Sequence, residues 1–194
     1  MCANIRAKFQ SLPVAVAQFP YFDAIDMLSN IDILREMKAG HIKISPFNPD
    51  QLGGASVDLT LSGEFSIMKK QPRAIDLSQH TFSGLFSKKT CPPLTLKPLE
   101  LVLGKTMEKI SLANNIAGRL DGRSRYARLG LAVHVTSSLI QPGSSNHQVL
   151  EIINFSGRPI KLSAGLRISQ ATFSYLNSPT TKPYNKFGKI AKNQ

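Results

Sequence analysis

The chain has 194 residues, of which 42% are hydrophobic and 19% are charged. This length supports one domain with a substantial core, and the composition excludes a disordered chain. The 24 lysines and arginines outnumber the 12 acids, which gives a net charge of +12. Such an excess favours polyanionic partners: phosphates, nucleotides, nucleic acid or an anionic membrane surface.

The sequence predicts a cytoplasmic protein that does not cross a membrane. No apolar run approaches the roughly 18 residues that a membrane helix needs. The apolar stretch 12–17 is shorter than the usual core of a secretion signal, which has about 7–15 residues. Cys2 and Cys91 alone cannot form a disulfide framework or a zinc site, and a reducing compartment fits them best.

In chain order, an N-terminal arm over residues 1–30 precedes a predicted helix. Ser29 or Asn30 can cap this helix, and Gly40 can end it. Its expected apolar face consists of Ile31, Ile33, Leu34 and Met37.

The rest of the chain is expected to be mainly β, and proline and glycine residues separate the short segments. Val57, Leu59 and Leu61 alternate with polar residues, as in a half-buried strand. Many short strands of this kind predict a sandwich or barrel over residues 31–177, followed by a basic tail over 178–194. The further strand candidates are 64–68, 93–97, 100–105, 115–120, 131–136, 147–154, 159–162 and 167–175.

The segment 120–130, LDGRSRYARLG, carries the first chemical signal. Gly122 suits a tight turn, and residues 123–129 can form a short helix. A helix start beside arginines is a ready anion site. Ser124 and Arg128 are four residues apart and would share a helix face. The alternative is a capped surface helix with solvated arginines.

Glu151 carries the second signal, because it is the only acid from residue 122 to the C-terminus. It lies in the apolar segment 149–153, where alternation places Val149, Glu151 and Ile153 on one face. We therefore expect Glu151 to be at least half buried. A buried carboxylate needs a cation or donors, or its pKa rises, and either state suits a general acid or base. The alternative is a structural ion pair with an arginine.

Together these motifs resemble the dCTP deaminase family of the trimeric dUTPase superfamily. The resemblance spans about residues 31–194 and rests on the run from Asp121 to Leu131, then 133–136, Pro142-Gly143 and 149–151. Upstream, the run 54–61 with Phe65 and 75–77 resembles the first motif region of the family, and 182–185 resembles its C-terminal region.

The resemblance implies a distorted β-barrel or jelly-roll subunit and a homotrimer with sites between subunits. The implied reaction is hydrolytic deamination of dCTP to dUTP and ammonia. Magnesium would enter on the triphosphate, with no metal ligand from the protein. Zinc is not expected, because the zinc-deaminase pattern H-x-E…P-C-x-x-C is absent from the sequence. A membrane partner is not expected, and nucleic acid is possible but not favoured.

The resemblance also implies roles for individual residues. Glu151 matches the catalytic glutamate that moves protons, Arg128 the arginine that supports it, and Ser124 the serine that holds the attacking water. Asp58 matches a first-motif acid that is structural or linked to magnesium. Tyr184 matches a tail tyrosine that closes over the nucleotide, and His134 is expected to be a core or interface residue. The full predicted binding set is Arg123, Ser124, Arg125, Tyr126, Ala127, Arg128, Val135, Gln141, Val149, Leu150, Tyr184, Lys189 and Gln194.

Several residues depart from the family pattern, mostly in the loop 137–147. Arg125 replaces a small hydroxyl residue, and Leu139 stands where an arginine is frequent. Gln141 replaces an aspartate that binds the sugar hydroxyl, and Ser144 replaces an aromatic residue. This loop faces the sugar and base in the family, so the departures concern substrate choice.

Three functions therefore remain open at the level of sequence. The first is a dCTP deaminase, for which Glu151 argues. The second is an enzyme that hydrolyses dUTP or converts dCTP to dUMP, against which Gln141 argues. The third is a nucleotide-sensing or nucleic-acid-binding trimer without turnover, which the charge of +12 would suit.

Overall fold

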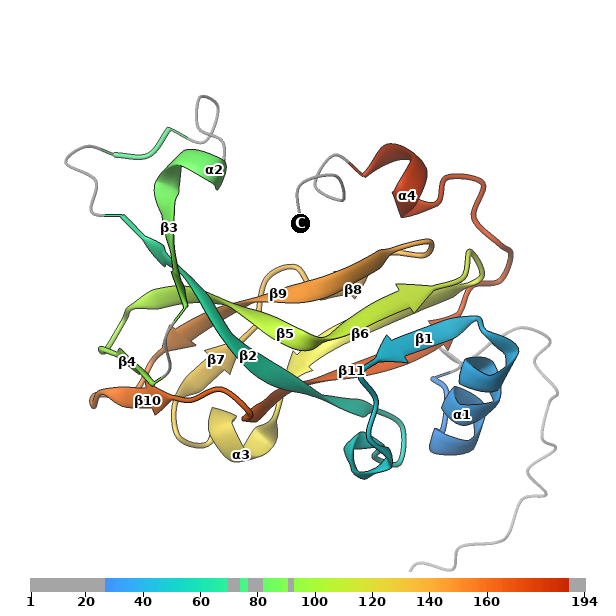
Figure 1. Cartoon of the computed structure of the whole chain (residues 1–194), viewed down its shortest axis with the longest axis horizontal. Helices are drawn as coiled ribbons and strands as arrows, with labels where there is room; N and C mark the ends of the chain where they lie inside the picture. Colours follow the sequence, from blue (N-terminus) through green and yellow to red (C-terminus); the bar gives the residue numbers. More distant parts are fainter. Residues whose placement is uncertain (1–26, 70–73, 77–81, 91–92, 189–194) are drawn as a thin grey trace, which may run out of the picture.

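The computed structural model describes residues 27–69, 74–76, 82–90 and 93–188 (Figure 1). Its helices are α1 (Asn30–Ala39), the 3-10 turn η1 (Pro49–Gln51), α2 (Phe82–Leu85), α3 (Ser124–Ala127) and α4 (Tyr184–Phe187). Its strands are β1 (Ile42–Ser45), β2 (Val57–Met68), β3 (Phe86–Thr90), β4 (Leu94–Leu96), β5 (Leu101–Leu112), β6 (Ile116–Gly122), β7 (Leu131–Val133), β8 (Leu139–Ile140), β9 (Ser145–Asn154), β10 (Ile160–Leu162) and β11 (Arg167–Tyr175).

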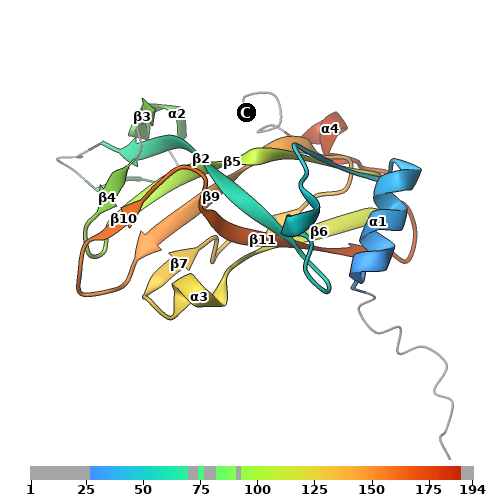
Figure 2. The ribbon, with the colours of Figure 1, turned by 60° about the horizontal axis from the view of Figure 1, so that its bottom comes forward.

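An antiparallel sheet organises the described chain, in the order β7-β9-β5-β2-β11-β6-β8. β1 adds to β5 and β3 adds to β2, while β4 and β10 form a separate pair. The large sheet curls into a half-barrel (Figure 2). The prediction of a mainly β, barrel-like fold with few short helices is confirmed. Among the described residues, no helix has the length and apolar character that crossing a membrane requires.

The core lies between the inward faces of the long strands. β2 alternates between buried and partly exposed positions from Val57 to Phe65, as the sequence predicts. β5, β9 and β11 contribute Ile110, Ile152 and Phe173, each at most 1% exposed. Alternation along each strand sends every second side chain to the other face, and on β9 that other face carries Glu151.

α1 begins and ends where the sequence predicts. The Ser29 hydroxyl accepts from the Asp32 amide, the Asp32 carboxylate accepts from the Ser29 amide, and Gly40 closes the helix with φ of 78°. The expected apolar face is wrong in part. Ile33 is fully buried, but Ile31 and Leu34 are 70% and 46% exposed.

Three strands were not predicted from the sequence. β1, β3 and β8 are short edge strands, and β1 and β3 carry lysines on exposed positions. β5 also extends beyond the predicted 100–105, because buried polar residues interrupt its apolar pattern. Glu108 is 2% exposed and accepts hydrogen bonds from the Gln51 side chain at 2.6 Å and the Thr60 amide at 2.8 Å.

The C-terminal segment after β11 follows a defined course over residues 176–188. The amides of Leu176 and Thr180 donate to the carbonyls of Asn115 and Asn114, and the Tyr184 amide donates to the Pro142 carbonyl. We call this segment the tail, and it runs from the β5–β6 turn to the 141–144 turn, where α4 lies (Figure 1).

Gly143 provides a test of how the tail docks. Its φ is +75°, and a Cβ there would lie 2.6 Å from the Cβ of Pro183. We expect Gly143→Ala to lower the free energy of unfolding by about 1–2 kcal/mol, from the left-handed backbone, and to displace the tail. Denaturant unfolding and hydrogen exchange at the Tyr184 amide measure both effects.

Gly165→Ala is the matched control, because Gly165 also has a positive φ of +83° but, within the described chain, nothing lies within 4 Å of a Cβ there. Equal tail exchange in the two variants would contradict the docked arrangement.

Candidate active site

A cleft of about 880 Å³ lies beside α3 and β7, which Figure 2 shows at the lower edge of the sheet. Its walls come from η1, β2, β6, α3, β7 and β11, so segments far apart in the sequence meet there. The charged and polar residues that line it include Asp50, Asp58, Arg119, Asp121, Arg123, Ser124, Arg125, His134, Ser138 and Gln170.

The predicted anion segment forms one wall of this cleft. The predicted helix over 123–129 is present but shorter, from Ser124 to Ala127, with Arg123 in extended conformation at its N-cap. The Arg128 amide donates to the Ser124 carbonyl at 3.1 Å. Ser124 has an exposed side chain and lines the cleft, as does Ala127.

Arg123 is fixed by two partners on neighbouring strands. One guanidinium nitrogen lies 3.0 Å from the Asp58 carboxylate, and another donates to the Arg167 carbonyl at 3.0 Å. Burial raises the pKa of Asp58 above its ordinary value, although the charges of Arg123, Arg167 and Arg125 oppose this. The cleft therefore presents Arg123 in one orientation, with Asp58 behind it.

Arg125 and Tyr126 are neighbours on α3 whose side chains are in contact but differ in exposure. The Arg125 guanidinium carbon lies 5.6 Å from the Tyr126 ring centroid, a cation–π arrangement. Tyr126 is partly buried against the core, whereas Arg125 is exposed and lines the cleft. This places Arg125, the departure from the family pattern, where an anionic ligand can reach it.

Arginines and aspartates line the cleft in equal number. Its lining includes three arginines (Arg119, Arg123 and Arg125) and three aspartates (Asp50, Asp58 and Asp121). A polyphosphate would need further positive charge than this wall supplies. Among the described residues, no cluster of three or more His, Cys, Asp or Glu side chains is arranged to hold a metal ion.

Glu151 lies on β9 opposite Leu103 of β5. Its side chain is 32% exposed, and it alternates with the fully buried Leu150 and Ile152. The predictions of its face and of its half-buried state are confirmed. The sequence thus places a carboxylate at the border between the apolar core and the cleft side of the sheet.

His134 is the partner of this carboxylate within the chain. Its Nδ1 lies 2.7 Å from Glu151 Oε2, and these two buried atoms have only each other as partner among the described residues. The His134 amide also donates to the Glu151 carbonyl at 2.7 Å. His134 is 8% exposed and has a φ of +55°, a strained conformation for a residue with a Cβ that persists where the surroundings impose it.

The contact of the second ring nitrogen of His134, Nε2, shows which ring atom is protonated. His134 Nε2 lies 2.6 Å from the Ser137 carbonyl oxygen, which can only accept, so Nε2 carries a proton. A second proton on the ring would lie on Nδ1, which is close enough to Glu151 Oε2 to form an ion pair. Burial raises the pKa of Glu151, but the bond and charge of His134 outweigh it, so the net pKa lies below the ordinary value.

The same pair shifts the histidine in the opposite direction. Burial lowers the pKa of His134, but the hydrogen bond and negative charge of Glu151 outweigh this, so its net pKa lies above 6.5. Between about pH 4.5 and 6.5 the second proton therefore resides on Nδ1, and Glu151 is ionised. His134 lines the cleft and Glu151 does not, so the histidine lies between the cleft and Glu151.

The predicted partner of Glu151, Arg128, occupies a different position. Its side chain is exposed, and no hydrogen bond or ion pair joins it to Glu151 within the described chain. The intrachain partner is His134, because the β7–β9 pairing brings the end of β7 against Glu151. Support of Glu151 by Arg128 stays a prediction for an assembly of chains.

The other predicted binding residues are distributed around this centre. Val135 is exposed and lines the cleft. Gln141 is half-buried in the 141–144 turn, Val149 is partly exposed on β9, and Leu150 has its side chain in the core, so it can offer only backbone contacts. Tyr184 begins α4. Lys189 and Gln194 lie outside the described residues.

Sequence reasoning underrated His134, which it placed in the core without a link to Glu151. The signal lay in the strand pairing and not in any motif. Asp50, Asp121 and Gln170 of the cleft were also not predicted as lining residues, because they come from three separate elements.

Comparison with known proteins identifies the family of the chain. The profile of the dCTP deaminase-like family matches residues 27–176. The chain belongs to the dCTP deaminase family. Its relatives include proteins named "dCTP deaminase, dUMP-forming" from Clavibacter michiganensis, 40% identical over 81% of this chain and 80% of the relative, and from Nocardioides, 38% identical over 84% and 87%.

Membership in the dCTP deaminase family confirms the predicted class, a hydrolytic deaminase. A solved structure of 2'-deoxycytidine 5'-triphosphate deaminase from Agrobacterium tumefaciens has the same fold, with a TM-score of 0.61 and 19% identity. The alignment covers 77% of the present chain but only 48% of the longer Agrobacterium chain. The present chain thus spans about half the length of that protein.

The His134–Glu151 pair predicts a characteristic pH dependence of stability. A lowered carboxylate pKa stabilises the fold above its unfolded value of about 4.5, and this is lost as pH falls through the folded value. A raised histidine pKa stabilises the fold below about 6.5, and this is lost as pH rises through the folded value. The pair should contribute most between these two limits.

We expect Glu151→Gln to lower the free energy of unfolding by about 1–2 kcal/mol at pH 6 and by clearly less at pH 9. Unfolding of both proteins at one concentration measures this. Glu64→Gln is the control, because its ion pair with Lys105 is solvent-exposed and should contribute little. An equal loss for Glu151→Gln at both pH values would contradict the charged pair.

Proposed function

We propose that this protein hydrolytically deaminates dCTP and carries the nucleotide on to dUMP and pyrophosphate. The observation that carries the proposal is an ionised, half-buried carboxylate, Glu151, whose proton is coupled to a histidine that lines an arginine-bearing cleft. Membership in the dCTP deaminase family and the names of the relatives support the substrate.

The deamination step needs one group that moves protons. A water oxygen bonds to C4 of the cytosine ring as Glu151 takes a proton from that water. Glu151 delivers this proton to ring N3, and then carries the second water proton from the hydroxyl on C4 to the exocyclic amine. The C4–N bond breaks, ammonia leaves, and the base becomes uracil. A carboxylate at this border position can accept and return the proton.

His134 bears directly on this step, because it holds the proton that Glu151 would otherwise carry. While a protonated His134 ring lies 2.7 Å from Oε2, the carboxylate is stabilised as an anion but is a weaker base. Movement of His134 away from Glu151 when the substrate binds would restore its basicity. We propose that Ser124 holds the attacking water and that Arg128 supports the carboxylate from a neighbouring subunit.

We propose that the triphosphate, with the magnesium that it carries, binds along Arg123 and Arg125. The fixed orientation of Arg123 by Asp58 supports this assignment. The equal number of arginines and aspartates in the cleft supports a site that receives further positive charge from another subunit, as in a homotrimer with shared sites. A cytoplasmic location stays a prediction from the two cysteines.

The product distinguishes two versions of this function. The relatives named as dUMP-forming favour a second hydrolysis, in which water splits dUTP into dUMP and pyrophosphate. Gln141 favours release of dUTP, because the sequence has an amide where the family has an aspartate near the sugar. We propose the dUMP-forming version, since the relatives resemble this chain over most of its length.

The deciding experiment incubates the purified protein with dCTP and magnesium and separates the products by chromatography. The proposal predicts ammonia, dUMP and pyrophosphate in equal amounts. Accumulation of dUTP without pyrophosphate would support deamination alone and overturn the second step. Bound dCTP without turnover would contradict the enzyme and favour a nucleotide sensor.

We expect Glu151→Gln to lower the deamination rate by roughly 10²–10⁴-fold, the usual contribution of a general acid–base group. Binding of dCTP, measured by calorimetry, should change less than about threefold, because the amide keeps the shape of the side chain. Glu64→Gln, the exposed acid on β2, is the control. Turnover by Glu151→Gln at the wild-type rate would refute the assigned role.

A further inference from the structure

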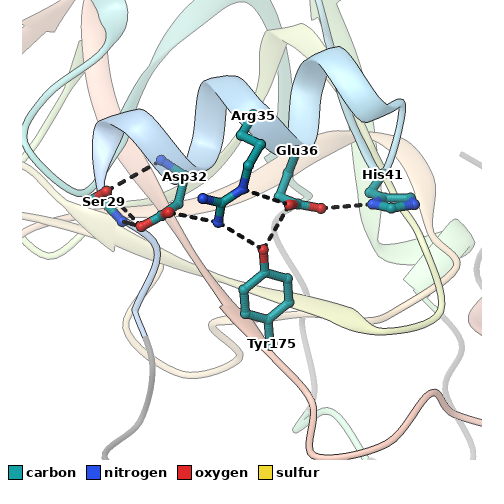
Figure 3. A network of polar contacts seen from close by, with 6 residues as sticks. All are labelled: Ser29, Asp32, Arg35, Glu36, His41 and Tyr175. Atoms are coloured by element: carbon teal, nitrogen blue, oxygen red, sulfur yellow. Dashed lines mark hydrogen bonds and ion pairs between the residues drawn. The ribbon is translucent and has the colours of Figure 1, made fainter.

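A network of charged and polar side chains lies outside the cleft, where α1 packs beside the end of β11 (Figure 3). Its centre is the Glu36 carboxylate, a residue 7% exposed. Glu36 Oε1 accepts from the Tyr175 hydroxyl at 2.7 Å, and Oε2 lies 2.7 Å from His41 Nδ1. Both oxygens of a nearly buried acid are thus engaged by rings from elsewhere in the chain.

Arg35 and Asp32 extend this network along the helix. The Arg35 guanidinium forms an ion pair with Asp32 at 2.7 Å and donates to the Tyr175 hydroxyl at 3.4 Å. Figure 3 shows the Tyr175 hydroxyl directed between Arg35 and Glu36. Burial is the largest single influence and raises the pKa of Glu36, but the contacts with His41, Tyr175 and Arg35 outweigh it, so the net pKa lies below its ordinary value. Glu36 is therefore an anion that accepts strong hydrogen bonds.

The position of Tyr175 gives the network a consequence for the tail. Tyr175 is the last residue of β11, and the next amide, of Leu176, donates to the Asn115 carbonyl at 2.8 Å. On the other side of the same β5–β6 turn, the Ala113 amide donates to the His41 carbonyl at 2.8 Å. The Glu36 carboxylate thus joins, through Tyr175 and His41, the two segments that hold this turn.

The same turn then directs the tail. The Thr180 amide donates to the Asn114 carbonyl at 2.9 Å, and the Tyr184 amide donates to the Pro142 carbonyl at 2.9 Å. Three backbone hydrogen bonds therefore lead from the root of the tail at Tyr175 to Tyr184. A change in the direction in which the chain leaves β11 would therefore also displace Tyr184.

We infer that Glu36 and Tyr175 are positioning residues for the tail. Their hydrogen bond fixes the point and direction at which residues 176–188 leave the sheet, and so sets the position of Tyr184. The resemblance to the family predicts that this tyrosine closes over the nucleotide. The inference rests on the proposed function for its effect on substrate, and on the contacts of α1 for its mechanism. It gives α1 a part in substrate binding, although no residue of the helix lines the cleft.

Tyr175→Phe is the direct test, because it removes the hydroxyl and keeps the ring. In the nucleotide-free protein we expect amide hydrogen exchange at Leu176, Thr180 and Tyr184 to accelerate about tenfold, consistent with loss of a hydrogen bond to a charged group. Exchange in β6 should not change. In the enzyme assay we expect KM for dCTP to rise several-fold while kcat stays within about twofold.

Glu36→Gln serves as the second variant, should Tyr175→Phe fold poorly. Its amide oxygen can accept one of the two hydrogen bonds, so its tail exchange should fall between wild type and Tyr175→Phe. Ser87→Ala is the matched control, since it removes a hydroxyl hydrogen bond to Ile67 on β2, far from the tail in the fold, and should leave both tail exchange and KM unchanged.

The two readouts separate the possible failures. Unchanged tail exchange in Tyr175→Phe overturns the inference, as does faster tail exchange with an unchanged KM. Faster exchange throughout α1, β1 and β6 would show a general structural role and would also overturn it. If wild-type protein does not turn over dCTP, the proposed function has failed, and hydrogen exchange alone still decides whether Glu36 and Tyr175 anchor the tail.

Discussion

The site depends on how one carboxylate is accommodated in an apolar strand. Glu151 alternates with fully buried residues of β9, so it cannot leave the sheet without displacing the core. The β7–β9 pairing brings His134 to it, and the Ser137 carbonyl fixes the ring tautomer. A charge that would be costly to bury alone is thereby kept ionised and next to a cleft. The contact with His134 therefore both stabilises Glu151 in the fold and sets its protonation state.

The same principle, an acid held by a partner from a distant segment, recurs at two other places. Asp58 of β2 orients Arg123 at the start of α3, and Glu36 of α1 holds the Tyr175 hydroxyl at the end of β11. In each case the acid uses its charge to fix a residue that faces a ligand or leads to one. In a chain with a net charge of +12, three of the 12 acids therefore act by fixing the orientation of another residue.

Much of the fold could be predicted from the sequence, because the long strands alternate cleanly and α1 carries its own cap residues. Glu151 also stood out as the only acid in the last third of the chain. Its partner could not be predicted, because His134 meets it only through strand pairing and a left-handed backbone. β5 was predicted too short, since buried Glu108 breaks the apolar pattern. The order of the tail depends on backbone hydrogen bonds, which leave no mark in side-chain composition.

The most direct test of the central claim is the protonation of His134, read from the ¹⁵N chemical shifts of its ring nitrogens between pH 5 and pH 9. The account predicts that both nitrogens carry protons at pH 6, that Nδ1 loses its proton at a pH above 6.5, and that Glu151→Gln lowers this pH. A ring that is already neutral at pH 6, with a titration unaffected by Glu151→Gln, would contradict the charged pair on which the site is built.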